Sequence, residues 1–170
     1  MDESMRIERA SACDAEEIFN LYRSLIDEPY GTWSEEYPDR ELVDEDLAEQ
    51  TVFVMRDAQR RIVSAIVMEQ SDEFDGMAPW YPDVTRWIQL GRLGVAKQMQ
   101  GQGVARTMLA YAMDEAQRAG YEAVRFLVGA KNLPAQRSYA RFGFEICGET
   151  FQWDEHWLCY EKRLDQADKA

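Results

Sequence analysis

The chain has 170 residues, of which 46% are hydrophobic and 30% charged, and its formal net charge at pH 7 is -13. This size and composition suit one domain, residues 1–170, that buries a full core. The excess of acid argues against a nucleic acid as partner, and no apolar run is long enough to span a membrane. The acidic start, residues 1–4, is unlike a signal peptide, so we expect a cytoplasmic protein. Cys13, Cys147 and Cys159 are spaced neither for a metal site nor for a disulfide framework, so we expect no metal.

The first half of the chain predicts two helices and three strands. In chain order these are a strand at residues 6–10, helices at 13–26 and 40–48, and strands at 51–55 and 62–68. The last two strands are separated by only five residues, which indicates a hairpin. Aromatic residues occupy the loops that follow the first helix and the hairpin; they are Tyr30, Trp33, Tyr37, Trp80 and Tyr81.

The second half continues with strands and helices in alternation. We expect a strand at residues 87–95, a helix at 104–119, a strand at 124–128, a helix after 132, strands at 144–147 and 157–160, and a frayed polar tail at about 165–170. Gly91 and Gly94 predict a bulge or splay near the end of the first of these strands, and Gly120 predicts a helix C-cap. This order indicates an α/β (α+β) fold with a single mixed sheet and helices on both of its faces.

A glycine-rich turn joins the strand at 87–95 to the helix that follows. Its residues are Gln98-Met99-Gln100-Gly101-Gln102-Gly103. Backbone N–H groups at the start of a helix have no partner within the helix, and the helix dipole is positive there. The turn therefore predicts a site for a phosphate or another anion at residues 101–105.

Two nucleotide-binding fingerprints with glycine-rich turns do not fit. A dinucleotide-binding turn has a third glycine where this chain has Arg106, and the Gly-Lys-Ser or Gly-Lys-Thr of a P-loop is absent. Taken alone, the turn would serve equally well as a plain strand-to-helix connection.

A second motif follows at the expected distance. Residues 93–105, Leu-Gly-Val-Ala-Lys-Gln-Met-Gln-Gly-Gln-Gly-Val-Ala, resemble the acetyl-CoA-binding motif of the GNAT N-acetyltransferase superfamily. After the strand at 124–128 come Asn132, Ala135, Tyr139 and Gly143-Phe144, which resemble that family's Asn-x-x-Ala-x-x-x-Tyr-x-x-x-Gly-Phe segment. The two motifs occur in the family's order and at its separation, so together they are far more specific than either alone.

The resemblance implies a GNAT-like fold with a mostly antiparallel sheet whose strands splay at a cofactor cleft. It also implies an acyl-CoA N-acyltransferase that moves the acetyl group of acetyl-CoA to a primary amine by direct attack. Lys97 could add charge beside the phosphates. The cofactor-binding residues that it implies are Leu93, Val95, Gln98, Gly101, Gln102, Gly103, Val104, Ala105, Arg106 and Asn132.

Tyr139 is the catalytic residue that the resemblance implies. A phenol with an ordinary pKa of about 10 is protonated at neutral pH and can give its proton to a departing thiolate. The alternative is a core tyrosine, since Ala135 and Tyr139 lie on one helix face. Asn132, which the resemblance assigns to the cofactor, has an alternative role as a helix N-cap, because it precedes Pro134 at a helix start.

The general base stays open. Residues 84–95 contain no carboxylate, although relatives often carry one there, and Gln89 cannot accept a proton. A surface or packing role is the simpler interpretation of His156, the only histidine. The remaining candidates, besides a chain of water molecules, are Glu35, Glu36, Glu69 and Asp72.

Charge favours a small cationic amine as acceptor, because residues 27–49 contain ten acids and one base. A solvated acidic surface is the alternative. Trp33, Tyr37, Glu36 and Trp80 could line an acceptor pocket, or the aromatic residues could anchor their loops. A protein or peptide amine as acceptor, and an acetyl-CoA-binding domain without turnover, stay as alternatives. The sequence allows either a monomer or a homodimer.

Overall fold

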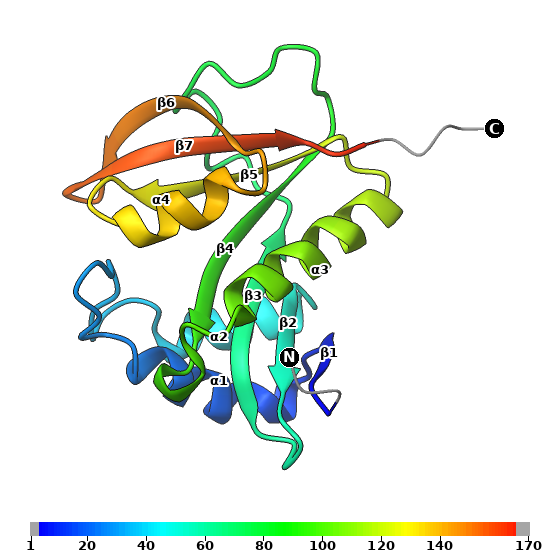
Figure 1. The fold of residues 1–170 in the computed structure, drawn as a ribbon, viewed down its shortest axis with the longest axis vertical. Helices are drawn as coiled ribbons and strands as arrows, with labels where there is room; N and C mark the ends of the chain where they lie inside the picture. Colours follow the sequence, from blue (N-terminus) through cyan, green and yellow to red (C-terminus); the bar gives the residue numbers. More distant parts are fainter. Residues whose placement is uncertain (1–3, 166–170) are drawn as a thin grey trace. The chain divides into compact units, whose positions relative to one another are not determined.

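A computed structural model of the protein describes residues 4–165, which form seven strands and four α-helices (Figure 1). The strands hydrogen bond in the order β1-β2-β3-β4-β5-β7-β6. The pair β4–β5 is parallel, whereas β1–β2, β2–β3, β5–β7 and β6–β7 are antiparallel, so the predicted mixed and mostly antiparallel sheet is confirmed. The elements are β1 (Arg6–Arg9), a 3-10 turn (Ala12–Asp14), α1 (Ala15–Arg23), α2 (Arg40–Ala48), β2 (Val52–Arg56), β3 (Ile62–Glu69), β4 (Trp87–Val95), a 3-10 turn (Lys97–Met99), α3 (Val104–Arg118), β5 (Ala123–Gly129), α4 (Leu133–Ala140), β6 (Glu145–Gln152) and β7 (Glu155–Arg163).

The chain divides into two compact units. The first contains residues 1–68 and 91–112, and the second contains residues 69–90 and 113–170. β4 and α3 each contribute residues to both units, since the boundaries fall after Leu90 and after Ala112. The predicted phosphate turn belongs to the first unit, and Tyr139 belongs to the second.

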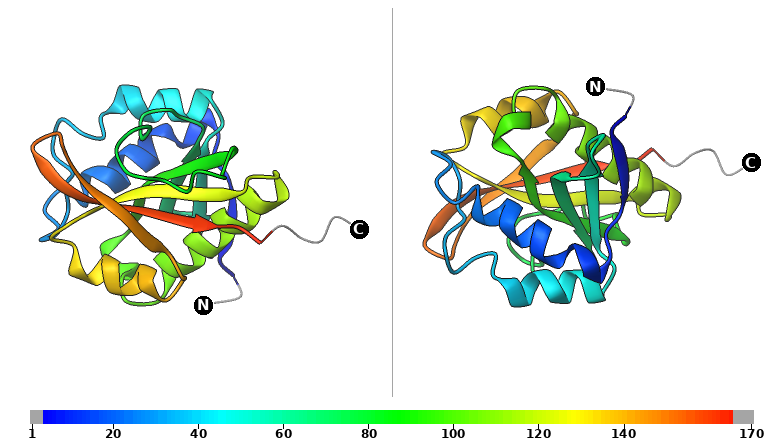
Figure 2. Two further views of the ribbon diagram at one scale, coloured as in Figure 1. Left: turned by 90° about the horizontal axis from the view of Figure 1, so that it is seen from above. Right: turned by 90° about the horizontal axis from the view of Figure 1, so that it is seen from below.

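In the first unit, helices cover both faces of the strands β1–β3. Figure 2 shows α1 and α2 on one side of β2 and β3 and the start of α3 on the other. The ring of Phe53 on β2 contacts Tyr111 of α3, with 5.5 Å between ring centroids. On the opposite face the carboxylate of Glu17 in α1 accepts a hydrogen bond from the Ile62 backbone at 2.5 Å. Val54 and Met55 between these layers are fully buried.

The first helix is shorter than predicted. The pattern predicted residues 13–26, whereas α1 ends at Arg23 and is followed by turns. The hydroxyl of Ser24 donates to the Leu21 carbonyl at 2.6 Å and so satisfies an acceptor at the helix end. α2 has the predicted bounds, because Asp39 caps it by accepting a hydrogen bond from the Leu42 amide at 2.8 Å.

In the second unit, α4 covers one face of β5 and β7. Phe126 of β5 stands at the centre of an aromatic group, with its ring centroid 5.0 Å from Tyr139, 4.7 Å from Phe144 and 5.4 Å from Tyr160. On the other face Arg125 forms a buried ion pair with Glu161 of β7. Consecutive strand residues point to opposite faces, so Arg125, which also lies over the rings of Trp80 and Trp87, faces away from the aromatic group around Phe126.

β6 and β7 form a hairpin longer than the predicted strands at 144–147 and 157–160. Its turn is Trp153-Asp154, with φ of 51° and 60°. Two-residue hairpin turns need positive φ, and glycine or asparagine usually supplies it. The turn was missed in the sequence because neither residue type is present. Of the predicted frayed tail, residues 166–170 lie outside the described residues.

Candidate functional site

The turn before α3 has the backbone shape that only glycine adopts easily. Gly101 has φ 73° and Gly103 has φ 82°, both in the left-handed region. A Cβ added at either position would meet no heavy atom within 4 Å. The glycines are therefore required by the path of the backbone, and the face of the turn beside them is open.

Backbone donors are bare at the start of α3. The Gly103 carbonyl accepts the Thr107 amide at 3.0 Å and the Thr107 hydroxyl at 3.1 Å, which marks it as the cap residue. Within residues 4–165 the amides of Gly103, Val104, Ala105 and Arg106 find no acceptor. Four unpaired donors and the positive end of the helix dipole fit an anion such as a pyrophosphate, as the turn predicted.

Two glutamine side chains of the turn stabilise it by hydrogen bonds to backbone carbonyls. Gln102 donates to the Gln98 carbonyl at 2.9 Å, and Gln100 donates to the Val95 carbonyl at 3.1 Å. Lys97 is held by Asp27, with 2.6 Å between Nζ and Oδ1. Arg106 is exposed and forms no ion pair in the part of the chain that the structure describes. Of the two predicted sources of positive charge, Arg106 is thus the one without a carboxylate partner.

β4 contains the irregularity that its glycines predicted, but at a neighbouring residue. Arg92 has φ 47°, whereas Gly91 and Gly94 keep negative or extended values. Gly94 is needed for space, because a Cβ there would lie 3.0 Å from Leu25 Cδ1 and 3.1 Å from Trp33. Leu93, between Arg92 and Gly94, is half-buried, as is Val95.

The predicted acceptor-pocket residues lie in both units. Trp33 packs edge-on against Tyr22, with 4.9 Å between ring centroids, and Trp80 donates its indole N–H to the Phe74 carbonyl at 2.8 Å. These contacts anchor the loops, as the alternative held. Tyr37 and Glu36 are exposed.

Tyr139 is partly buried among aromatic rings of the second unit. Its ring packs edge-on against Phe126, and its centroid lies 6.2 Å from that of Tyr160. Burial, and to a smaller extent the neighbouring Tyr160, raises the pKa of Tyr139 to about 12. The phenol therefore keeps its proton throughout the neutral range, as an acid must.

Asn132 is the N-cap of α4. Its side-chain oxygen accepts a hydrogen bond from the Ala135 amide at 3.1 Å, and Pro134 lies in the first turn. The cap interpretation is therefore correct. Capping uses the oxygen only, so the side-chain nitrogen still has its two donors.

A polar cluster at Gln89 was missed in the sequence analysis. The buried side-chain nitrogen of Gln89 on β4 donates to Glu69 at 3.1 Å and to Glu73 at 3.3 Å. The side-chain oxygen is also buried and finds no hydrogen-bond partner among residues 4–165. Glu69 was among the predicted base candidates and Glu73 was not. A glutamine at a buried position of an apolar strand was the available signal.

Two other residues considered for the base make ion pairs of their own. Glu35 is exposed and pairs with Arg23 in the first unit. His156 is exposed on the hairpin, where its Nε2 lies 2.8 Å from Glu149 Oε2. The surface interpretation of His156 is thus the one that the structure supports.

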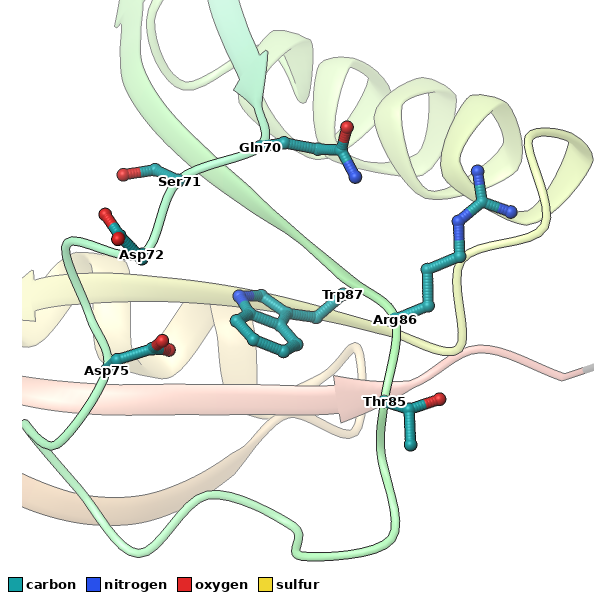
Figure 3. A pocket seen from close by; sticks show the side chains of 7 residues that line it. All are labelled: Gln70, Ser71, Asp72, Asp75, Thr85, Arg86 and Trp87. Atoms are coloured by element: carbon teal, nitrogen blue, oxygen red, sulfur yellow. The ribbon is translucent and has the colours of Figure 1, made fainter.

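The loop between β3 and β4 borders an open hollow of about 530 Å³ on the surface of the second unit. Its walls are residues 70–72, Asp75 and residues 85–87 (Figure 3). Figure 3 shows the indole of Trp87 directed toward the loop segment that carries Asp72 and Asp75. The predicted base candidate Asp72 therefore faces this hollow.

The chain matches the Acetyltransferase (GNAT) family over residues 18–144, which include both motifs. It is a GNAT family acetyltransferase. The GNAT resemblance drawn from the two motifs is thereby confirmed. A rat protein, N-acetyltransferase 8, is 32% identical over 77 residues, which make up 45% of this chain. The match spans only 35% of that protein's length.

Solved structures of GNAT acetyltransferases share the whole fold. The protein yncA of Salmonella typhimurium, solved with its cofactor acetyl-CoA, has a TM-score of 0.75 at 18% identity and covers 98% of this chain and 97% of its own. A GNAT family acetyltransferase of Streptococcus agalactiae has a TM-score of 0.79 at 20% identity, and the match covers 97% of this chain and 98% of that one. The ribosomal-protein-S18-alanine N-acetyltransferase of Escherichia coli reaches 0.74 at 15% identity, covering 97% of each chain.

Two further properties of this GNAT chain concern metals and membranes. Among the described residues, no three histidine, cysteine or acidic side chains are grouped as a metal site would need. None of the helices in residues 4–165 has the length and apolar character required to cross a membrane.

Proposed function

We propose that this GNAT protein transfers the acetyl group of acetyl-CoA to a primary amine on a small cationic molecule. The observation that carries the proposal is the bare set of amides at residues 103–106, placed by two glycines with positive φ. A pyrophosphate is the anion that this site suits, because several N–H donors and a helix dipole act on it together.

The same residues would hold the rest of the cofactor. Arg106 is exposed beside the bare amides and would add a positive charge. The backbone near Leu93 and Val95, next to the irregularity at Arg92, would bind the pantetheine arm, and so would the side-chain nitrogen of Asn132. The parallel pairing of β4 with β5 joins only Trp87–Gln89 to Ala123–Arg125, and both strands continue beyond it.

The reaction is a balanced exchange of one bond for another. Acetyl-CoA supplies an acetyl group activated as a thioester, so the amine nitrogen forms a bond to the carbonyl carbon as the carbon–sulfur bond breaks. The amine has to be neutral to attack. Tyr139 would supply a proton to the thiolate, since burial raises the pKa of its phenol to about 12 and the phenol is therefore protonated at neutral pH.

The acceptor class is supported by charge. Ten acids against one base in residues 27–49, and Asp72 and Asp75 at the hollow, favour a cation. A protein amine is the second candidate, because the Escherichia coli acetyltransferase with the same fold is named for a ribosomal protein. A shared fold at 15% identity does not distinguish a small-molecule acceptor from a protein acceptor.

The test is calorimetric titration of the protein with acetyl-CoA, followed by a thiol-release screen with amines. Binding and release with small cationic amines support the proposal. Release with basic peptides alone would favour the protein-directed enzyme, and binding without release would favour a domain that binds acetyl-CoA without turnover. Absence of binding would contradict the cofactor site itself.

A further inference from the structure

The orientation of the Gln89 side chain is forced by its neighbours. Carboxylates can only accept hydrogen bonds, so the amide nitrogen has to face Glu69 and Glu73. The amide oxygen then points elsewhere, and no donor in the described part of the chain reaches it, although the residue is only 3% exposed and so has little access to water. A buried acceptor without a donor is rare in folded proteins and calls for a partner.

Gln89 and Tyr139 act from opposite faces of the same strand pair. Gln89 is in register with Arg125 of β5, and Arg125 stacks on Trp87, two residues before Gln89, at 4.2 Å. The next residue of β5, Phe126, points to the other face and contacts Tyr139. The Gln89–Arg125 pair is the last one between β4 and β5, so an acceptor bound at Gln89 would have to reach the acetyl carbon beyond this pair, where the two strands are no longer paired.

The groups around Gln89 make its surroundings negative. Glu69 ends β3, Glu73 lies in the loop, and the positive charge of Arg125 is paired with Glu161. Residues 70–86 contain neither helix nor strand, so this loop, which carries the exposed Glu73, is the segment that can shift to admit a ligand.

We propose that the side-chain oxygen of Gln89 accepts a hydrogen bond from the reacting nitrogen of the acceptor, and that Glu73 takes its proton. This inference rests on the proposed function. The ammonium gives one proton to the Glu73 carboxylate, directly or through one water molecule, and the freed lone pair attacks the acetyl carbon. The second proton leaves the nitrogen after attack and balances the one that Tyr139 gives to the thiolate. Glu69 holds the amide in place.

The hollow lined by Trp87, Asp72 and Asp75 indicates what the acceptor carries besides its reacting nitrogen. Trp87, in its wall, is two strand residues from Gln89 on the same face, a spacing of roughly 7 Å. Asp72 and Asp75 face the hollow, whereas the guanidinium of Arg86 lies over Tyr121 at 4.5 Å. The site therefore suits a second cationic group about six bonds from the reacting nitrogen, as in the linear diamine diaminopentane.

The first experiment measures steady-state kinetics of Gln89→Leu and Glu73→Gln with diaminopentane as acceptor. Gln89→Leu should raise the KM for the diamine about tenfold, with unchanged acetyl-CoA affinity, since the acceptor for the reacting nitrogen is removed. Glu73→Gln should lower kcat/KM near neutral pH, and the loss should shrink as the pH nears the pKa of the amine. Glu16→Gln, an exposed acid of α1, is the matched control and should change nothing.

The second experiment compares diaminopentane with pentylamine. The diamine should have a kcat/KM at least about tenfold higher, and Asp72→Asn with Asp75→Asn should remove this preference while leaving the pentylamine rate unchanged. If wild type and Gln89→Leu turn over the diamine with equal KM and kcat, the proposed role of Gln89 is overturned, whereas the proposed function is not. Equal rates for both amines would overturn the diamine assignment. Failure of every amine to release thiol would overturn the proposed function, and this inference with it.

Discussion

The guanidinium of Arg92 makes two hydrogen bonds to the carboxylate of Asp46, at 2.9 Å from Nε and 2.8 Å from Nη2. Asp46 lies on α2 and Arg92 on β4, and both side chains are almost completely buried. The pair therefore fixes α2 to β4 at the one β4 residue with positive φ. Such a conformation is strained for arginine and persists only where surrounding contacts hold it.

Removing the carboxylate should therefore be costly. We expect Asp46→Ala to lower the free energy of unfolding by about 3–5 kcal/mol, because the buried charge of Arg92 would lose both hydrogen bonds to this carboxylate. Urea unfolding measures this. The control is Asp44→Ala on the same helix, whose exposed pair with Arg40 should contribute less than about 1 kcal/mol. Equal effects of the two substitutions would show that the buried pair is not special.

Tyr139→Phe should separate catalysis from binding. It removes only the hydroxyl, so kcat should fall about a hundredfold, as the loss of a general acid predicts, while acetyl-CoA affinity stays nearly unchanged. Thiol release and calorimetry give the two quantities. Tyr30→Phe, at an exposed tyrosine, serves as the control. Equal turnover of Tyr139→Phe and wild type would remove Tyr139 from the mechanism.

The pH profile should lack an alkaline decline in the accessible range. Burial raises the pKa of Tyr139 to about 12, and the acid form is the active one, so activity that depends on it would be lost only as pH rises through that value. We expect kcat to keep rising to about pH 10 as the acceptor amine loses its proton, with no decline from Tyr139 in that range. A decline that begins near pH 8, and that Tyr139→Phe abolishes, would contradict the raised pKa.

A negative charge at Gly103 should prevent cofactor binding. Gly103→Glu places a carboxylate beside the bare amides of α3, so acetyl-CoA affinity should fall at least about tenfold. Gly103→Gln has the same size and the same backbone strain without the charge, and it should bind more tightly than the Glu variant. Calorimetry on both folded variants decides the question. Equal affinities would refute electrostatic recognition at this turn.

Glu122 should stabilise the protein only above acidic pH. Its carboxylate accepts hydrogen bonds from the amides of Arg86 at 2.8 Å and Thr85 at 2.7 Å, and these bonds lower its pKa in the folded state. A lowered pKa contributes stability above the unfolded value, which is lost as the pH falls through the folded one. Glu122→Gln should therefore unfold at lower urea concentration than wild type at pH 7, and the difference should shrink toward pH 3. Glu16→Gln, at an exposed acid of α1, should match wild type at both pH values.

The sequence predicted the elements that local patterns determine. The bounds of β4 and α2 were correct, because apolar periodicity and the Asp39 cap are properties of neighbouring residues. The length of the β6–β7 hairpin was not predicted, since the turn Trp153-Asp154 takes positive φ without glycine. At this turn the pairing of β6 with β7 overrides the preference of Trp153 and Asp154 for negative φ.

The candidate site divides in the same way. The phosphate turn was visible in the sequence, because Gly101 and Gly103 adopt a backbone that other residues resist and a helix start exposes its own amides. The pairs of Gln89 with Glu69 and Glu73 are separated by 20 and 16 residues, and Arg92 and Asp46 by 46. No local pattern relates such residues, since only the paths of the strands and loops decide which polar side chains become buried together.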